Sequence, residues 1–529
     1  MSGYFAFTQK AAYHARDEAI KKFNLTEDDL PYFRTLHSLA FRKLGLKSKD
    51  RVSLIFHNSP EFLALYFSAL CFGLTVVPIN PDIAPKEMGY IINDSKSKAI
   101  FYSNVLESKI KNIKNLDDVK LKKITSINDQ EFSLKNDDSF EENEISVHDT
   151  AVIIYTSGTT GNPKGVILSH LNLMSDSKSI SEWFHFDTKT RTLCILPLYH
   201  NNGQITTLLA PLYQGGSTVI VQGKVSLLSF WDLVNRYDVT WTSVMASILS
   251  ILLSISKERK DQTLKAILCG GQILTRTIQK QFEDRFEVPI FEGYGLTETS
   301  PVMTVGHPEF FKYGTVGKPI PGVEVKIAED GEILCRGHNV MKGYYKEPEA
   351  TAEAIDKDGW FYSGDIGMFD EDGLLKITDR KKSLIVTSGG KNVAPQPMEV
   401  TLTSNKYVEQ CLAIGDDRNF ISALVVPSRD NLIAWAEKNG MESMDYESLC
   451  ADQKTYDMYN SIVEEAMTKF SRYESVRKIT LIPQEWTVEA GELTPKLSIK
   501  RKVVTEKHQA EIDQMYTGKK EVLEGELGG

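Results

Sequence analysis

The stretch AVIIYTSGTTGNPKG, residues 151–165, decides how the rest of the chain is interpreted. Its first four residues are apolar and are typical of a buried strand. Glycine and hydroxyl residues follow at once, and their backbone N–H groups can converge on an anion because glycine has no Cβ to block the approach. The pattern predicts a phosphate-binding loop, although the usual GxxxxGK[ST] spacing is absent. Its candidate residues are Thr156, Ser157, Gly158, Thr159, Thr160, Gly161 and Lys164.

On both sides of this loop, strand-like and helix-like segments alternate. Such alternation predicts βαβ units and a largely parallel sheet. After about residue 311 the strands become short and are separated by glycine turns, which predicts a small antiparallel β unit. From about residue 383, a mixed α+β piece has its own hydrophobic pattern. The predicted strands are 51–56, 75–79, 99–102, 151–155, 192–196, 217–221, 264–268, 323–327 and 331–334.

Composition excludes some functions and leaves others open. Lys and Arg total 61 against 71 Asp and Glu, and this acidity argues against a nucleic-acid binder. The six cysteines form no CxxC or metal-ligand spacing, which favours a reduced, cytoplasmic setting. The uncharged stretch 62–79 is interrupted by Gly73 and Pro78, so it predicts a buried helix at 61–72 and a core strand at 75–79. We therefore expect no transmembrane span, while peripheral membrane contact stays possible.

A second motif, Glu-Gly-Tyr-Gly-Leu-Thr-Glu at 292–298, combines an aromatic ring, a hydroxyl and a carboxylate. The ring can stack on a base, the hydroxyl can bond a phosphate, and the carboxylate suits Mg²⁺, which prefers oxygen ligands. The two motifs together indicate a nucleotide site.

With these motifs the chain resembles the adenylate-forming superfamily, which includes acyl-CoA synthetases, luciferases and peptide-synthetase adenylation domains. The resemblance runs from about residue 50 to about 505 and implies an α/β fold. The implied N-terminal domain, 1–379, contains two αβ subdomains and a small β-barrel. A hinge at 380–382 then leads to a small mobile α+β C-terminal domain, 383–529.

The resemblance also implies roles for individual residues. Lys164 and its loop handle the ATP phosphates, Tyr294 stacks on adenine, Thr297 binds the α-phosphate and Glu298 holds Mg²⁺. Asp365 and Arg380 reach the ribose, and Lys382 is the hinge residue. His200 lies beside the carboxylate and the thiol entry. The further implied nucleotide-site residues are Gly270, Gly271, Gln272, Glu292, Gly293 and Gly295.

The C-terminal part most resembles long-chain fatty acyl-CoA synthetases. The loop TSGGKNVAP, 387–395, matches their glycine loop, so Gly389 and Gly390 are implied to line the channel for a pantetheine arm. The pocket for the acid is implied to lie near 243–247 and 270–272. A fatty or other hydrophobic acid is the expected substrate. CoA or the phosphopantetheine of a carrier protein is the expected acceptor.

One position departs from the family pattern. Ser498 stands where the long-chain subgroup has a lysine that bridges the carboxylate and the α-phosphate. Three explanations stay open. Lys496 or Lys500 supplies the charge, since residues two apart on a strand face the same side; the enzyme works mainly on preformed acyl-AMP; or catalysis is lost and acyl or nucleotide binding remains. A luciferase-like oxidative enzyme would share the same nucleotide motifs.

Overall fold

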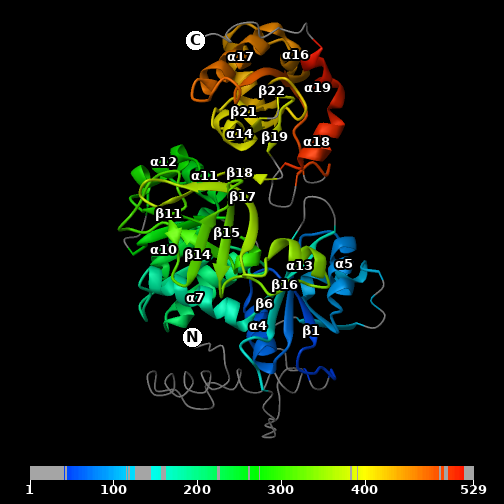
Figure 1. Cartoon of the computed structure of the whole chain (residues 1–529), viewed down its shortest axis with the longest axis vertical. Helices are drawn as coiled ribbons and strands as arrows, with labels where there is room; N and C mark the ends of the chain where they lie inside the picture. Colours follow the sequence, from blue (N-terminus) through cyan, green and yellow to red (C-terminus); the bar gives the residue numbers. More distant parts are fainter. Residues whose placement is uncertain are drawn as a thin grey trace. The chain divides into compact units, whose positions relative to one another are not determined.

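The computed structural model shows two compact units (Figure 1). They comprise the described residues of Met1–Ser363 with Met368–Lys376, and of Gly364–Gly367 with Ile377–Gly529. The hinge at 380–382 stays a prediction. The structure describes residues 41, 44–114, 116, 119–124, 144–156, 162–222, 227–259, 263–272, 274–381, 384–389, 391–487, 490–493 and 499–517.

The first unit contains two seven-stranded sheets. In the first sheet the order is β16-β6-β5-β2-β1-β3-β4. Strands β1 to β5 are parallel to one another, and β6 pairs antiparallel with both of its neighbours, β5 and β16. The prediction of a largely parallel sheet is confirmed. The strands are β1 Arg51–Ile55, β2 Thr75–Ile79, β3 Ala99–Ser103, β4 Lys120–Ile124, β5 Thr150–Thr156, β6 Lys164–Ser169 and β16 Gly343–Tyr344.

The uncharged stretch 62–79 folds as predicted. Helix α4, Pro60–Phe72, begins where the Ser59 side chain accepts a hydrogen bond from Phe62 N, and it ends at Gly73, whose φ of 79° suits glycine. The helix leads into β2, and α5, Pro85–Ser95, connects β2 to β3. Among the described residues, no helix has both the length and the apolar character that a membrane crossing requires.

The second sheet has the order β13-β12-β11-β10-β9-β7-β8, with β7 to β11 parallel. The prediction of a strand at 264–268 is two residues early, because pairing with β9 begins only at Ala266. The strands are β7 Arg191–Cys194, β8 Ser217–Ile220, β9 Trp241–Val244, β10 Ala266–Gly270, β11 Ile290–Gly295, β12 Val302–Val305 and β13 Lys318–Pro319. The main helices are α7 His170–Trp183, α10 Phe230–Arg236, α11 Ala246–Ile255 and α12 Arg276–Phe286.

In the region of the predicted small β-barrel, the structure has a four-stranded sheet in the order β14-β15-β17-β18. Beyond β18, Val316 N donates to Leu375 O and Leu375 N donates to Gly317 O, each at 2.8 Å, so the segment that leads into β13 continues the pairing. The short antiparallel strands predicted after residue 311 are confirmed by β14 and β15. The elements are β14 Val323–Ile327, β15 Glu332–Gly337, α13 Pro348–Ala354, β17 Phe361–Phe369 and β18 Leu375–Arg380.

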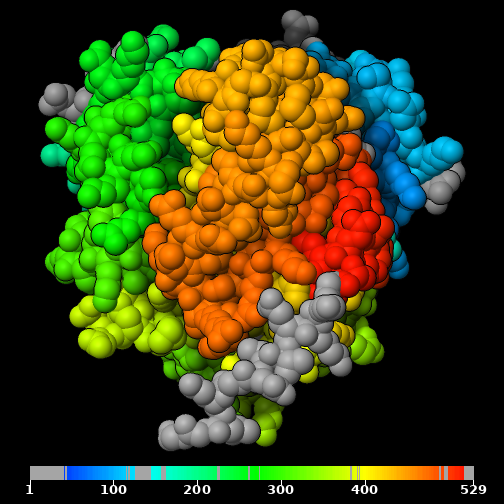
Figure 2. Space-filling model, turned by 90° about the horizontal axis from the view of Figure 1, so that it is seen from above, coloured from blue at the N-terminus to red at the C-terminus, as the bar shows by residue number. Residues whose placement is uncertain are grey.

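The second unit is the predicted α+β piece. Helices pack against a three-stranded sheet, β21-β22-β23, around a core that includes Met398, Val425 and Val463. Figure 2 shows one face of this unit, with α17 in orange and α18 and α19 in red. Its elements are β19 Ile385–Val386, β20 Asn392–Val393, α14 Pro395–Thr403, β21 Val408–Ile414, β22 Ile421–Pro427, α15 Arg429–Lys438, α16 Tyr446–Ala451, α17 Gln453–Met467, β23 Val476–Leu481, α18 Arg501–Lys507 and α19 Gln509–Tyr516.

Candidate active site

The second sheet gathers several predicted site residues at one edge. β9, β10 and β11 are parallel, and they end at Val244, Gly270 and Gly295. Ligands of open α/β sheets bind beyond the carboxyl ends of such strands. Gly271 and Gln272 follow β10 directly, and Thr297 and Glu298 follow β11, so this edge brings together two segments that the sequence singled out separately.

Glycine at position 295 lets the chain turn back on itself after β11. A Cβ built there would lie 1.7 Å from Pro301 O, so no other residue fits without moving backbone. The turn continues through the short helix η6, Thr297–Thr299, where Leu296 N donates to Thr299 Oγ1 at 2.9 Å. Thr297 and Glu298 are therefore held in a fixed loop at the sheet edge.

Glu298 is linked to the phosphate-loop lysine through a tyrosine. The Tyr344 hydroxyl donates to Glu298 Oε1 at 3.0 Å, and Lys164 Nζ lies 5.2 Å from the centroid of the Tyr344 ring. Burial, followed by the neighbouring Glu298 carboxylate, raises the pKa of Tyr344, so the phenol keeps its proton and stays a donor. The structure thus joins the two nucleotide motifs within one cluster, Lys164–Tyr344–Glu298.

Sequence reasoning missed Tyr344. The residue lies on β16, which pairs with β6 through Tyr344 and Val166 and so brings the tyrosine beside Lys164. An aromatic residue after Gly343 was the only local signal. The pairing of two strands far apart in the chain cannot be read from that signal alone.

The phosphate loop begins as predicted, at the end of a buried strand. Thr156, the last residue of β5, pairs with Lys164, the first residue of β6, so both stand at the base of the connection between these antiparallel strands. Lys164 is exposed. The other predicted loop residues lie outside the described residues: Ser157, Gly158, Thr159, Thr160 and Gly161.

Within β11, Glu292 is half-buried and Tyr294 is buried. Burial raises the pKa of Glu292 to about 7, although Leu274 N donates to its Oε1 at 3.4 Å. This carboxyl therefore keeps its proton to a higher pH than a solvent-exposed glutamate does. Tyr294, the predicted adenine-stacking residue, is only 8% exposed. Gly293, between them, pairs with Gly270 of β10.

The histidine motif lies close to Thr297. His200 precedes the short helix α8, Asn201–Gln204, and its ring centroid is 4.8 Å from that of Tyr199. The next residue, Asn201, donates from Nδ2 to Thr297 O at 3.3 Å. This contact brings the His200 segment to the loop that carries Thr297 and Glu298.

In the second unit, the two predicted ribose residues form an ion pair. Arg380 Nε lies 3.1 Å from Asp365 Oδ1, and the Asp365 side chain is buried. The neighbouring Asp379 accepts from Arg380 N at 2.5 Å, and its burial raises its pKa to about 6. Lys382, the predicted hinge residue, lies outside the described residues.

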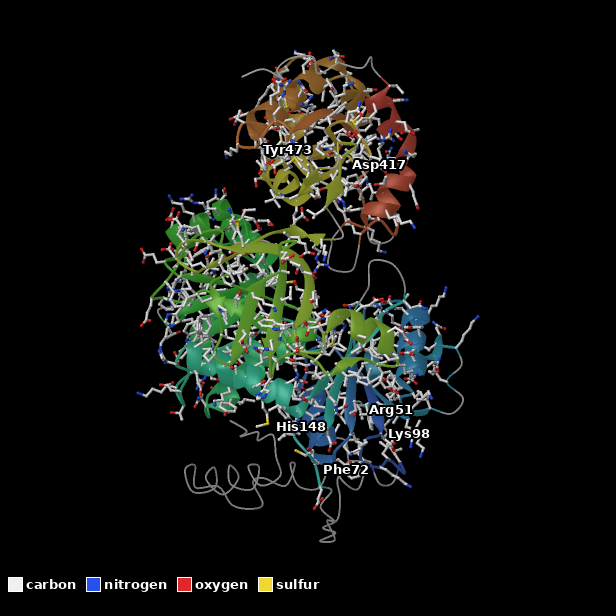
Figure 3. The ribbon with its side chains drawn as sticks, in the orientation of Figure 1. Arg51, Phe72, Lys98, His148, Asp417 and Tyr473 are labelled. Atoms are coloured by element: carbon white, nitrogen blue, oxygen red, sulfur yellow. The ribbon has the colours of Figure 1, made fainter. Side chains whose placement is uncertain are left out.

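The glycine loop of the second unit is held at its edges and open at Gly389. Thr387 N donates to Lys391 O and Ser388 N donates to Arg418 O, each at 3.0 Å. Figure 3 labels Asp417, which precedes Arg418, and Tyr473, whose ring centroid is 4.0 Å from Lys391 Nζ. A Cβ built on Gly389 would have its nearest neighbour at 4.0 Å. Gly390 lies outside the described residues.

The substitute lysines are only partly described. Lys500 is exposed and caps the start of α18, and its backbone N donates to Glu492 O at 2.8 Å. Lys496 and Ser498 lie outside the described residues. For Mg²⁺, the carboxylate of Glu298 fits a cation that proteins bind through one or two carboxylates together with substrate phosphates. Elsewhere in the described part of the chain, no group of three or more His, Cys, Asp or Glu suggests a separate metal centre.

Two family models match nearly the whole chain. Residues 37–345 match the model of the AMP-binding enzyme, and residues 382–520 match the model of its C-terminal domain. The chain belongs to the AMP-binding enzyme family. It is thus an AMP-binding (adenylate-forming) superfamily member, as the motifs predicted.

Relatives and solved structures agree with this assignment. The chain is 29% identical over 541 residues to long-chain-fatty-acid–CoA ligase FadD15 of Mycobacterium bovis, covering 90% of both. It is 33% identical over 387 residues to 2-succinylbenzoate–CoA ligase of Bacillus pumilus, covering 71% of this chain and 77% of the relative. The anthranilate CoA ligase AuaEII with anthranoyl-AMP has a TM-score of 0.76 at 19% identity, covering 91% and 92%. MenE of Bacillus subtilis with ATP and magnesium has a TM-score of 0.71 at 24% identity, and the match covers 89% of this chain and 92% of MenE. Together these structures show the α/β fold with a large N-terminal and a smaller C-terminal domain.

Proposed function

We propose that this AMP-binding enzyme is an acid–thiol ligase that forms an acyl-AMP from ATP and a fatty or other hydrophobic acid and transfers the acyl group to CoA. The observation that carries the proposal is the Lys164–Tyr344–Glu298 cluster, which places a cation and a carboxylate from separate motifs around one tyrosine. A cytoplasmic location stays a prediction.

Two features support the nature of the substrates. The curated relatives reported above are named as CoA ligases of a long-chain fatty acid and of 2-succinylbenzoate, so the family uses acids of differing chemistry. The open surroundings of Gly389 suit the narrow pantetheine arm that CoA and a carrier protein share. FadD15 aligns over most of both chains, which favours the fatty acid and CoA.

In the first step, a carboxylate oxygen of the acid attacks the α-phosphorus of ATP, and the bond to pyrophosphate breaks. Lys164 would neutralise the charge of the leaving pyrophosphate, and the backbone at Thr297 would orient the α-phosphate. Glu298 would hold Mg²⁺, which supplies charge neutralisation on the phosphate oxygens. Tyr344 keeps the Glu298 carboxylate in one orientation through its hydrogen bond.

In the second step, the thiol sulfur attacks the acyl carbonyl and the bond to AMP breaks. The Asp365–Arg380 pair would bind the ribose hydroxyls, since a carboxylate accepts two vicinal O–H bonds. His200 would lie near the reacting carbonyl because its segment contacts Thr297 through Asn201. Gly389 and Gly390 would guide the pantetheine arm.

A second candidate, favoured by Ser498, is an acyltransferase that works mainly on preformed acyl-AMP. Loss of a preorganised cation from an adenylation site typically costs about 10²–10³ in rate. Lys496 and Lys500 are the candidate replacements, and Lys500 is exposed. A non-catalytic acyl- or nucleotide-binding homologue is the remaining alternative.

The test measures the two steps separately. We would follow pyrophosphate release from ATP, Mg²⁺ and a panel of fatty and aromatic acids, and thioester formation from synthetic acyl-AMP with CoA or a carrier protein. Lys496→Ala and Lys500→Ala should identify the substitute cation as the one whose loss lowers only pyrophosphate release. Ser498→Lys should raise pyrophosphate release if the second candidate holds. Neither product from any acid or acceptor would overturn the ligase proposal.

A further inference from the structure

Two amide side chains stand at the edge of the second sheet where the acid must react. Asn202 lies in α8 and Gln272 follows β10, and both are partly exposed. The protein holds the oxygen of each amide in place, and this orientation determines what each side chain offers to a ligand.

The Asn202 side-chain oxygen accepts from Ser243 and lies beside the Thr206 hydroxyl, whose single proton is shared with Asn202 O at 2.6 Å. Ser243 Oγ donates to Asn202 Oδ1 at 3.2 Å, and Thr206 Oγ1 lies 2.8 Å from the same oxygen. Ser243 is buried at the end of β9 and Thr206 is buried one turn after Asn202. With its oxygen turned toward these hydroxyls, the amide directs its N–H₂ group the other way.

The Gln272 oxygen is held by backbone. Ser247 N donates to Gln272 Oε1 at 3.2 Å. A backbone N–H can only donate, so the atom facing it must be the amide oxygen, and the N–H₂ group points away from Ser247. Within the part of the chain that the structure describes, neither Asn202 Nδ2 nor Gln272 Nε2 donates a hydrogen bond to a protein acceptor.

Both donors flank one turn of the chain. Ser243, which precedes Val244 and Met245, contacts Asn202. Ser247, which follows them, contacts Gln272. Beside Gln272, a Cβ built on Gly271 would meet nothing within 4 Å, so there is open space at this point of the edge.

The same turn lies next to the reacting groups. Asn201, the neighbour of Asn202, contacts Thr297 O, and Gln272 follows Gly270, which pairs with Gly293 of β11. On the proposed function, an acid whose carboxylate is joined to the α-phosphate near Thr297 would extend its first carbons past these amides. A chain of methylene groups would leave both N–H₂ groups without acceptors, and each unpaired, desolvated donor costs about 1–3 kcal/mol.

We propose that the acid carries an oxygen acceptor on its acyl chain, close to the reacting carboxylate, and that Asn202 and Gln272 donate hydrogen bonds to it. This inference rests on the proposed acid–thiol ligase function. The pair is uncharged, so a hydroxyl, a keto oxygen or a second carboxylate suits it. Asn202 and Gln272 are thus specificity-determining residues, because a site that hydrogen-bonds a substrate oxygen discriminates strongly against the analogue without it.

The test compares matched acids. We would measure kcat/KM for pyrophosphate release with octanoate, 3-hydroxyoctanoate, 3-oxooctanoate and octanedioate on the full chain. We expect at least one oxygenated acid to exceed octanoate by about tenfold or more. The three oxygenated acids distinguish hydroxyl, keto and carboxylate acceptors. Equal kcat/KM for octanoate and for all three would overturn the inference while leaving the ligase proposal standing.

Variants show whether the amides cause the preference. Asn202→Leu and Gln272→Met keep the approximate size of each side chain and remove its donors. Each should lower the ratio of kcat/KM for the preferred oxygenated acid to kcat/KM for octanoate about tenfold. Asn235→Leu is the matched control, because Asn235 is exposed on α10. ATP-dependent thermal stabilisation would verify folding, and Thr206→Val, which frees the Asn202 amide, is a milder second test. If the variants slow both acids equally, the amides bind the reacting carboxylate and the inference fails.

Discussion

Two glycine-containing segments of this enzyme differ in how tightly the protein holds them. In the segment 292–301, Gly295 packs against the Pro301 backbone, and Glu298 accepts a hydrogen bond from Tyr344. In the loop 387–391, Gly389 has open surroundings, and the flanking residues are held by backbone hydrogen bonds, by the Thr387 hydroxyl and by the contact of Lys391 with Tyr473. The difference indicates that the groups proposed for adenylation are held in place beforehand, while the loop proposed for the thiol leaves room for a chain to pass.

The largest effect should come from adding one methyl group to each segment. Gly295→Ala should lower the free energy of unfolding by more than about 4 kcal/mol or prevent folding, because the new Cβ would overlap Pro301 O. Gly389→Ala should change the free energy of unfolding by less than about 0.5 kcal/mol. Urea unfolding of both variants measures the contrast. Similar losses in the two would show that the segments do not differ in packing.

Removing the charge of Glu298 should give the next largest effect. Glu298→Gln should slow pyrophosphate release about 10²–10³-fold, because a preorganised group that holds Mg²⁺ near the transferring phosphate is lost. Thioester formation from supplied acyl-AMP should change much less. Glu349→Gln, on the exposed start of α13, is the control. Equal losses in both steps would mean that Glu298 supports the fold and not the chemistry of one step.

The buried segment should also carry a titration that the open loop lacks. The pKa of Glu292 is raised from 4.5 to about 7 by burial, so its contribution to stability is fully present below about pH 4.5 and is lost as the pH rises to about 7. The loss should be about 3 kcal/mol at pH 8, since each unit of pKa shift corresponds to about 1.4 kcal/mol. The Glu292→Gln variant should therefore unfold at a higher temperature than the wild type at pH 8. At pH 4.5 the two proteins should unfold at the same temperature.

Thermal unfolding across this pH range measures the Glu292 effect. Glu329→Gln is the control because Glu329 is exposed. A wild type and a Glu292→Gln variant with parallel pH profiles would contradict the prediction.

The smallest effect should come from the tyrosine that orients Glu298. Tyr344→Phe should slow pyrophosphate release about tenfold, since a hydrogen bond to a charged group contributes about 1.5–3 kcal/mol. Tyr345→Phe should leave the rate unchanged, because no hydrogen bond of the Tyr345 hydroxyl is found in the described structure. Initial rates with a saturating acid check this. A rate for Tyr344→Phe equal to that of the wild type would show that Glu298 is held without it.

The outline of the fold could be predicted because it depends on local patterns. Apolar runs bounded by glycine and proline placed α4 and β2, and alternation predicted the parallel sheets. The order β14-β15-β17-β18 and the pairing of Leu375 with residues 316–317 could not be predicted, because they depend on strand curvature and on contacts that no short pattern encodes. Of the site, Thr297 and Glu298 were predictable from one contiguous motif.

The sequence by itself therefore determined the family, the sheet class and the residues that lie within continuous motifs, because hydrophobic period, glycine placement and hydroxyl content act over a few neighbouring residues. Only the tertiary structure decided that Tyr344 joins Lys164 to Glu298, that Asp365 pairs with Arg380, and that Asn202 and Gln272 turn their N–H₂ groups outward. These contacts join residues from separate strands and loops, and their geometry depends on strand register and on the packing of the whole unit.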